Sequence, residues 1–333
     1  MGGNMDNNHS LIGLLWRGCA MGIAEVIPGV SGGTIAFITG IYERLLNSIS
    51  SISPELFRVL IKDGFKPFAE KLDLMFIIKL VLGMIVGVVI GIVLVTKALE
   101  STPTVLWAFF FGLILASVFY MLNQVVSKNI SAWVLFAFTA VLSYLIVNIS
   151  PATGSEHPLY IFTCGAIAIC ALILPGVSGS FMLLILGMYT FIIPKLKSLF
   201  ESFSTDAFVQ VTIFAVGCIF GLLAFSKILK YIFNKYRDNV IMALSGLMLG
   251  SLSKMWPWRN PILVIDKANG ETVSRTDFLA DPLNDSFKLI SEQNVLPSDY
   301  IGNPMVVYAV LFMLIGFSIV FFSMLIDNKT SKS

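Results

Sequence analysis

Two copies of one short motif, 147 positions apart, contain the residues of this chain that are best suited to bind an anion. The first copy reads Pro28-Gly29-Val30-Ser31-Gly32-Gly33-Thr34, and the second reads Pro175-Gly176-Val177-Ser178-Gly179-Ser180. Hydroxyl groups and backbone N–H groups donate hydrogen bonds, and glycine lets a ligand approach the backbone closely. Where such a motif opens a helix, the free N–H groups and the helix dipole favour an anion, above all phosphate.

Two ionisable residues precede the first motif within the same apolar stretch. Arg17 and Glu25 align with Cys164 and Leu172 of the second copy, so the charges are not duplicated. Ionisable side chains inside membrane segments are costly and mark functional sites. Glu25 is therefore a candidate proton-titrating or ligand-orienting group, and Arg17 is a candidate to contact two phosphate oxygens. A structural ion pair between them is the alternative.

The composition predicts the elements that position these motifs. The chain is 56% hydrophobic and 13% charged, with a mean hydropathy of +0.86, which is typical of a polytopic membrane protein. A net charge of +2 gives no reason to expect a nucleic-acid partner. We expect membrane spans at about 74–96, 104–122, 132–149, 208–229, 240–252 and 305–325.

The two motifs lie at the middles of two longer apolar regions, 11–49 and 159–196. Proline and glycine favour a helix break at each motif, and a break at bilayer depth survives only inside protein or beside a wet cavity. The halves on either side are about 15 to 17 residues long, which is short for a crossing. We therefore expect two re-entrant hairpins, while two full spans in each region stay the alternative.

The similarity between the two halves extends beyond the motifs. Gly40 and Tyr42 recur as Gly187 and Tyr189 at the offset of 147, and later glycine patterns recur at an offset of 134. This order predicts a duplication into 1–150 and 151–333, each with one hairpin and three spans. A re-entrant hairpin does not cross the membrane, so each half crosses it three times. Because three is an odd number, the second half starts on the opposite side and must be inverted. Breaks at matching positions of inverted repeats predict a shared transport site.

The distribution of charge predicts the orientation. Basic residues gather in the loop 50–73 and near 227–237, and the C-terminal tail carries two more lysines. In the outer loop 254–300, acidic residues outnumber basic ones seven to five. The positive-inside rule therefore places both termini in the cytoplasm.

The chain closely resembles a bacterial family of multi-pass polyprenyl-phosphate (undecaprenyl-phosphate) translocases. The resemblance rests on the pattern Gly18-x-x-x-Gly22-x-Ala24-Glu25-x-x-Pro28-Gly29-Val30-Ser31-Gly32-Gly33-Thr34, and on Leu174 with the second motif. It implies a flippase that returns the lipid carrier to the inner leaflet of the cytoplasmic membrane for envelope synthesis. The lipid phosphate and the bilayer are the expected partners, protons are a candidate coupling ion, and no cofactor or metal is expected.

Two other functions stay open on the residues alone. A membrane lipid (pyro)phosphatase would use Ser31 or Ser178 as the nucleophile, but the stretches that precede the two motifs offer one arginine and one glutamate and no histidine. A small-anion channel or exchanger would use the same half-helices. The expected substrate-binding residues are Arg17, Glu25, Gly29, Val30, Ser31, Gly32, Gly33, Thr34, Gly176, Val177, Ser178, Gly179 and Ser180.

Overall fold

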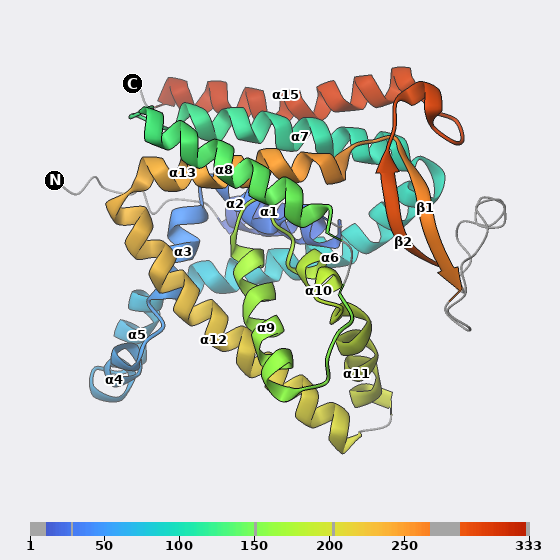
Figure 1. The fold of residues 1–333 in the computed structure, drawn as a ribbon. Helices are drawn as coiled ribbons and strands as arrows, with labels where there is room; N and C mark the ends of the chain where they lie inside the picture. The colour runs from blue at the N-terminus through green and yellow to red at the C-terminus, as the bar shows by residue number, and fades with distance from the viewer. Residues whose placement is uncertain (1–10, 28, 150–151, 202–203, 267–286, 331–333) are drawn as a thin grey trace.

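The computed structural model describes residues 11–27, 29–149, 152–201, 204–266 and 287–330 and is mainly helical (Figure 1). The first half contains α1 (Leu11–Val26), α2 (Gly32–Ile38), α3 (Tyr42–Ser50), α4 (Pro54–Lys62), α5 (Phe65–Leu72), α6 (Leu74–Ser101), α7 (Pro103–Asn123) and α8 (Ile130–Val147). The second half contains α9 (Pro158–Ile173), α10 (Gly179–Ile185), α11 (Tyr189–Glu201), α12 (Thr205–Lys235), α13 (Arg237–Ser251), η1 (Leu252–Met255), β1 (Arg259–Asp266), β2 (Phe287–Asn294), η2 (Pro297–Asp299) and α15 (Val306–Thr330).

Among the described residues, four helices are long and apolar enough to cross a bilayer, namely α6, α7, α8 and α12. The bent pair of α10 and α11, with 112° between its helices, also passes this test when taken together. The expected all-α polytopic membrane fold is therefore confirmed. The expected span at 240–252 corresponds to α13, which has 15 residues and is shorter than the roughly 20 that a straight crossing needs.

Both apolar regions that carry a motif fold back on themselves. In the first, the Arg17 side chain on α1 donates a hydrogen bond from Nε to the carbonyl oxygen of Thr39, the C-cap of α2, at 3.2 Å. In the second, the hydroxyl of Tyr160 on α9 donates to the carbonyl oxygen of Leu186, the C-cap of α10, at 2.8 Å. Thr39 and Leu186 are 147 positions apart, so the same backbone position closes both hairpins. Their depth in a bilayer stays a prediction.

Glycines bring one long helix of each half against its hairpin. A Cβ added to Gly83 on α6 would overlap the carbonyl oxygen of Leu15 on α1. A Cβ added to Gly217 on α12 would overlap that of Phe162 on α9. Close packing through small residues is typical of membrane helices. The two glycines are 134 positions apart and the two carbonyls are 147 apart, so these contacts support the duplication. The inversion stays a prediction.

The remaining long helices pair across the two halves. α7 packs against α15, α13 packs against α8, and α7 also contacts α13. Figure 1 shows these four helices side by side. The boundary expected near residue 150 therefore does not separate two compact bodies, and its place between two repeats stays a prediction.

The buried core lies where the first hairpin turns. Ile27 and Val30 flank the first turn, and they share one cluster of buried side chains with Ile114 of α7 and Met248 of α13. The motif turn is thus surrounded by protein, which meets the condition for a broken helix at membrane depth.

The connecting segments hold more structure than the sequence predicted. The loop 50–73 contains α4 and α5, and the outer loop 254–300, for which the sequence predicted no role, contains the antiparallel pair β1–β2. This two-stranded sheet adds to the all-α membrane fold, and the sequence did not predict it, because a short apolar run between charged residues gives a weak strand signal. Residues 267–286 of this loop lie outside the described residues.

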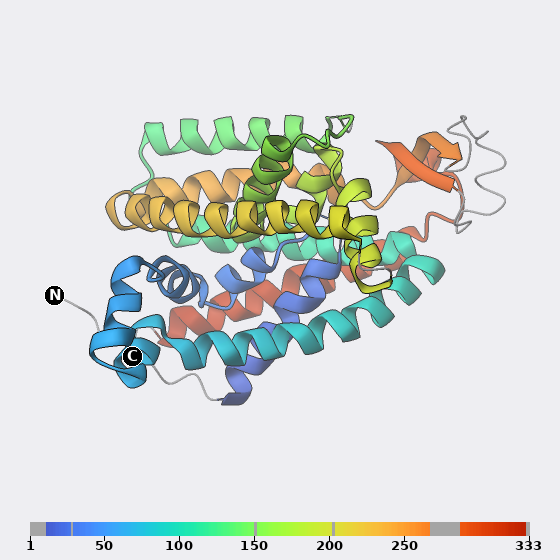
Figure 2. The same ribbon diagram turned by 90° about the horizontal axis from the view of Figure 1, so that it is seen from below.

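Figures 1 and 2 place β1–β2 at one end of the molecule, and α4, α5 and the α12–α13 joint at the other.

Candidate functional site

The first motif forms a capped half-helix. Gly29 has a φ of +89°, a backbone conformation that glycine adopts without strain, and Pro28 before it lies outside the described residues. The hydroxyl of Ser31 caps α2 by accepting a hydrogen bond from the N–H of Gly33 at 3.1 Å. The N–H group of Gly33 at the start of α2 is therefore already hydrogen-bonded to a side chain of the protein itself.

Glu25 occupies the place where the sequence predicts an anion. Its Oε1 accepts a hydrogen bond from the N–H of Gly32 at 2.6 Å, so the carboxylate faces the start of α2. Arg17 is not brought to this point, because eight residues of α1 separate it from Glu25, about 12 Å along the axis. Its guanidinium donates to the carbonyl oxygens of Gly13 and Thr39. The structure therefore separates the two charged candidates.

The second motif repeats this geometry without the carboxylate. Gly176 has a φ of +83°, and Ser178 caps α10 by accepting from the N–H of Phe181 at 3.4 Å. The hydroxyl of Ser180 lies 2.9 Å from that of Ser178. Leu172 stands where the first copy has Glu25. The two half-helices are therefore chemically different.

The two motifs contact each other directly. The N–H of Gly176 donates to the hydroxyl oxygen of Thr34 at 3.0 Å. The hydroxyl of Ser31 donates to the carbonyl oxygen of Leu172 at 3.3 Å. A Cβ on Gly33 would lie 2.7 Å from the carbonyl oxygen of Ile173. The expected meeting of the two motifs is thus present, and their hydroxyls and glycines hold the hairpins together.

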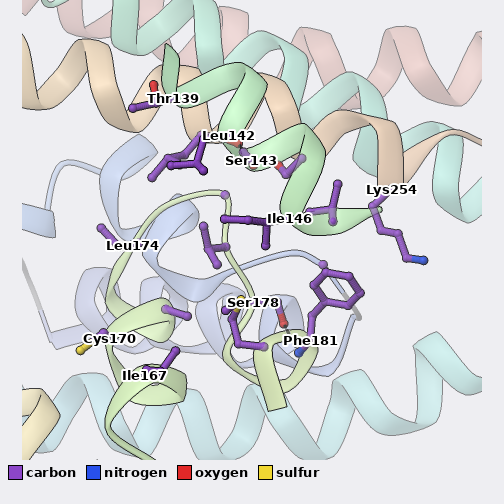
Figure 3. Close-up of a pocket in the computed structure, with 18 residues that line it drawn as sticks. Thr139, Leu142, Ser143, Ile146, Ile167, Cys170, Leu174, Ser178, Phe181 and Lys254 are labelled. Carbon is purple, nitrogen blue, oxygen red and sulfur yellow. Dashed lines mark hydrogen bonds between the residues drawn. The ribbon is translucent and has the colours of Figure 1, made fainter. Parts of the chain in front are cut away.

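An apolar cavity of about 370 Å³ lies beside the second motif, between α8, α9, α10 and α13 (Figure 3). Of the expected binding residues, it takes in Gly29, Gly176, Val177 and Ser178, and the other nine do not line it. The remaining lining residues are Thr139, Leu142, Ser143, Ile146, Val147, Ile167, Cys170, Ala171, Leu174, Phe181, Met182, Leu247, Ser251 and Lys254. We call this cavity 1.

Cavity 1 has a mainly aliphatic wall with one cationic residue. The hydroxyls of Thr139, Ser143 and Ser251 already donate to backbone carbonyl oxygens, at 2.8 to 3.1 Å. Lys254 lies at the edge of the cavity, and its Nζ is 5.5 Å from the ring centroid of Phe181 (Figure 3). From the sequence alone, no role was expected for Lys254. Its charge is visible in the sequence, but its distance from both motifs along the chain gave no reason to place it at their site.

The neighbouring cation Arg259 is held in the sheet. Its guanidinium donates to Glu292 at 2.9 Å and lies over the ring of Trp107, 4.4 Å from the centroid. Burial lowers the pKa of Arg259 and the charge of Glu292 opposes this, but an arginine stays protonated throughout the physiological range. Arg259 therefore fastens β1 to β2 and to α7.

A second cavity of about 420 Å³, cavity 2, lies nearer the α12–α13 joint. Leu135, Tyr236, Asn239 and Val240 are among its lining residues. Leu174 and Leu247 line both cavities. The two cavities therefore follow one another along α8 and α13, with these two leucines at the boundary.

Glu43 and Arg44 lie on α3, after the turn of the first hairpin, and they do not pair with each other. Arg44 donates to both carboxylate oxygens of Asp73, at 2.6 and 3.0 Å. Glu43 accepts from Arg237 at 3.3 Å. These ion pairs tie α3 to the start of α6 and to the start of α13, so neither residue belongs to a ligand site in this structure.

Fold and site together define a multi-pass membrane protein in which two broken-helix hairpins meet beside an apolar cavity, an arrangement typical of transporters. The chain belongs to the VCA0040-like family, described as undecaprenyl phosphate translocase-like, which matches residues 21–273. A polyprenyl-phosphate transporter of Vibrio cholerae is 42% identical over 257 residues, covering 77% of this chain and 81% of the relative. One of Staphylococcus aureus is 28% identical over 255 residues, covering 72% and 84%. No solved structure gives a significant match.

Proposed function

We propose that this protein transports polyprenyl phosphate across the bacterial cytoplasmic membrane and returns the lipid carrier to the inner leaflet. The observation that carries this proposal is cavity 1, which is lined mainly by aliphatic side chains and by Gly176, Val177 and Ser178 of the second motif. α8 packs on α13 and α9 packs on α12, so the cavity lies between two separate helix pairs. Leu142 and Ile167 at its edge are 40% and 38% exposed, which suits a prenyl chain that extends into lipid.

The phosphate group would be bound where the motifs meet. Gly176, Val177 and Ser178 line cavity 1, while Gly179 and Ser180 follow them. In the first motif, Glu25 holds the N–H of Gly32, so a phosphate there would have to displace a carboxylate of the same charge sign. Protonation of Glu25 would weaken that hold and is the step at which a proton gradient would act.

The lipid head would travel from cavity 1 to cavity 2. Both cavities lie along α8 and α13, and Leu174 immediately precedes Pro175 of the second hairpin. A movement of this hairpin would carry Leu174 away from Leu247 and join the two spaces. Such a movement provides access from each side of the membrane in turn.

The two other functions fit these contacts less well. Ser31 and Ser178 both cap half-helices, and among the described residues no histidine contacts either hydroxyl, so neither has the base that a nucleophile needs. A small-anion channel would need a polar path, whereas the lining of both cavities is mainly aliphatic. We therefore favour a lipid substrate and no enzymatic activity.

The orientation follows from the charge distribution. α4, α5 and the α12–α13 joint lie at one end of the molecule, and the basic residues of 50–73 and 227–237 belong to these segments. The sheet lies at the opposite end. We propose that the basic end and both termini face the cytoplasm.

Purified protein in liposomes tests the function. A short-chain polyprenyl phosphate with a fluorescent tail is placed in the outer leaflet, and its loss from that leaflet is measured by added quencher. We expect faster loss than in empty liposomes, and no acceleration for the matching polyprenol, which lacks the phosphate. Equal rates with and without protein, or equal acceleration of both lipids, would overturn the proposal.

A further inference from the structure

We propose that Lys254 is the cation that binds the phosphate of the lipid at the edge of cavity 1, while the first prenyl units occupy the cavity. This inference rests on the proposed function, which it deepens by naming a head-group residue outside both motifs. Lys254 belongs to η1, the short helix that joins α13 to the sheet.

The first argument is charge complementarity. Among the residues that line cavities 1 and 2, Lys254 alone carries a formal charge. The hydroxyls of Thr139, Ser143 and Ser251 are used by backbone carbonyls, so they are poor donors to a ligand. A lysine ammonium has three donors and attracts phosphate as a compact positive charge. It is therefore the strongest anion-binding group on the cavity.

The second argument is that, among the described residues, no carboxylate forms an ion pair with Lys254. Glu292 is an acidic neighbour, and it is bound to Arg259 at 2.9 Å. The ammonium lies over the ring of Phe181, 5.5 Å from the ring centroid. A half-buried lysine with only an aromatic partner keeps its donors for a ligand.

The third argument is the placement of Lys254 between the hairpins. A Cβ on Gly29 of the first motif would lie 3.8 Å from Cγ of Lys254 and against the side chain of Met255. Phe181, under the ammonium, belongs to the first turn of α10. η1 therefore rests on the first motif and reaches over the second. An anion on Lys254 would lie at the edge of cavity 1, which is lined by Gly29 of the first motif and by Gly176, Val177 and Ser178 of the second.

The shape of the site matches an amphipathic ligand. Figure 3 shows Lys254 at the edge of the cavity, with its ammonium turned away from the aliphatic side chains of the interior. A volume of about 370 Å³ lies within the range of small-molecule pockets, about 300–1,000 Å³. A phosphate at the edge would leave the aliphatic wall to the isoprenoid. A lysine that only extends its charge into water would make no such discrimination.

Binding to the purified full-length protein in nanodiscs tests the inference, with geranylgeranyl phosphate and geranylgeraniol as the two probes. In Lys254→Gln we expect the affinity for the phosphate to fall about ten-fold or more, because a hydrogen bond to a charged group is lost. The affinity for the alcohol should stay the same. Lys254→Arg should retain most of the phosphate affinity. The matched control is Lys97→Gln, which removes a lysine from an exposed position on α6.

The outcomes separate this inference from the proposed function. If the wild type binds the phosphate no better than the alcohol, both are overturned. If it prefers the phosphate and Lys254→Gln keeps that preference, the inference fails and the transporter stands. Rising salt should weaken phosphate binding in the wild type more than in Lys254→Gln, which a purely structural role would not produce. Inorganic phosphate should not displace the lipid at millimolar concentration; full displacement would point to a small-anion site and overturn the inference.

Discussion

The backbone N–H of Gly176 donates a hydrogen bond to the hydroxyl oxygen of Thr34 at 3.0 Å, and so joins the two motifs through residues that lie 142 positions apart in the chain. Thr34 is fully buried, and the bond is itself buried. It is a direct polar link between the two hairpins at the point where each one turns. Any movement of one hairpin relative to the other must keep this bond or exchange it.

Thr34→Val should destabilise the protein, because it removes the acceptor while keeping the shape of the side chain. A buried donor left without a partner costs about 1–3 kcal/mol. We expect a lower unfolding temperature in detergent for Thr34→Val, and near wild-type stability for Thr34→Ser, which keeps the hydroxyl. Equal stability of Thr34→Val and Thr34→Ser would show that the bond contributes nothing.

Glu25→Gln should separate the structural role of Glu25 from a titrating one. Glutamine still offers a carbonyl oxygen to the N–H of Gly32, so we expect the fold and lipid binding to be retained. If protons are coupled at this residue, transport by Glu25→Gln should no longer respond to a pH gradient across the liposome. The matched control is Glu100→Gln at an exposed position of α6. An unchanged pH response in Glu25→Gln would place the coupling elsewhere.

Gly33→Ala should push the hairpins apart. The added Cβ would lie 2.7 Å from the carbonyl oxygen of Ile173, closer than such atoms approach in proteins. Overpacking of this kind typically costs about 1–3 kcal/mol. Gly91→Ala is the control, because its Cβ would meet Ile23 and Val26 at 3.1 Å, which small shifts can relieve. Thermal unfolding of both variants measures the difference, and a more stable Gly33→Ala would contradict this packing.

Leu174→Trp should block transport without abolishing lipid binding, because a larger side chain at the boundary of the two cavities would obstruct the route between them. The liposome assay gives the transport rate, and probe binding in nanodiscs reports the state of cavity 1. Leu145→Trp is the control, since Leu145 is 56% exposed on α8 and lines neither cavity. Wild-type transport by Leu174→Trp would remove Leu174 from the route.

Cysteine labelling tests the orientation. In a background without the four native cysteines, Lys62→Cys on α4 should react only from the cytoplasmic side, and Leu296→Cys should react only from outside. Both positions are exposed, and they lie near opposite ends of the molecule. The reverse pattern would invert the topology. Labelling of either cysteine from both sides would indicate dual insertion.

The sequence by itself determined the membrane class and the paired motifs, and it favoured a hairpin over two full spans around each motif. These features are local or periodic: long apolar runs, a proline–glycine break and an offset of 147 between equivalent residues. The contacts of Gly83 with Leu15 and of Gly217 with Phe162 recur at offsets of 134 and 147, so they support the repeat that the residue types predict.

The tertiary structure decided how the candidate residues are combined. Arg17 and Glu25 lie on the same helix, α1. The side chain of Arg17 contacts the C-cap of α2 and that of Glu25 contacts the first residue of α2, because α2 runs antiparallel to α1 in the hairpin. Lys254 lines cavity 1 from η1, which lies far along the chain from the motifs and is brought over the second motif by the packing of α13. Contacts between residues so distant in the chain leave no periodic signal in the sequence, and the folded protein alone brings the lysine, the cavity and the motif together.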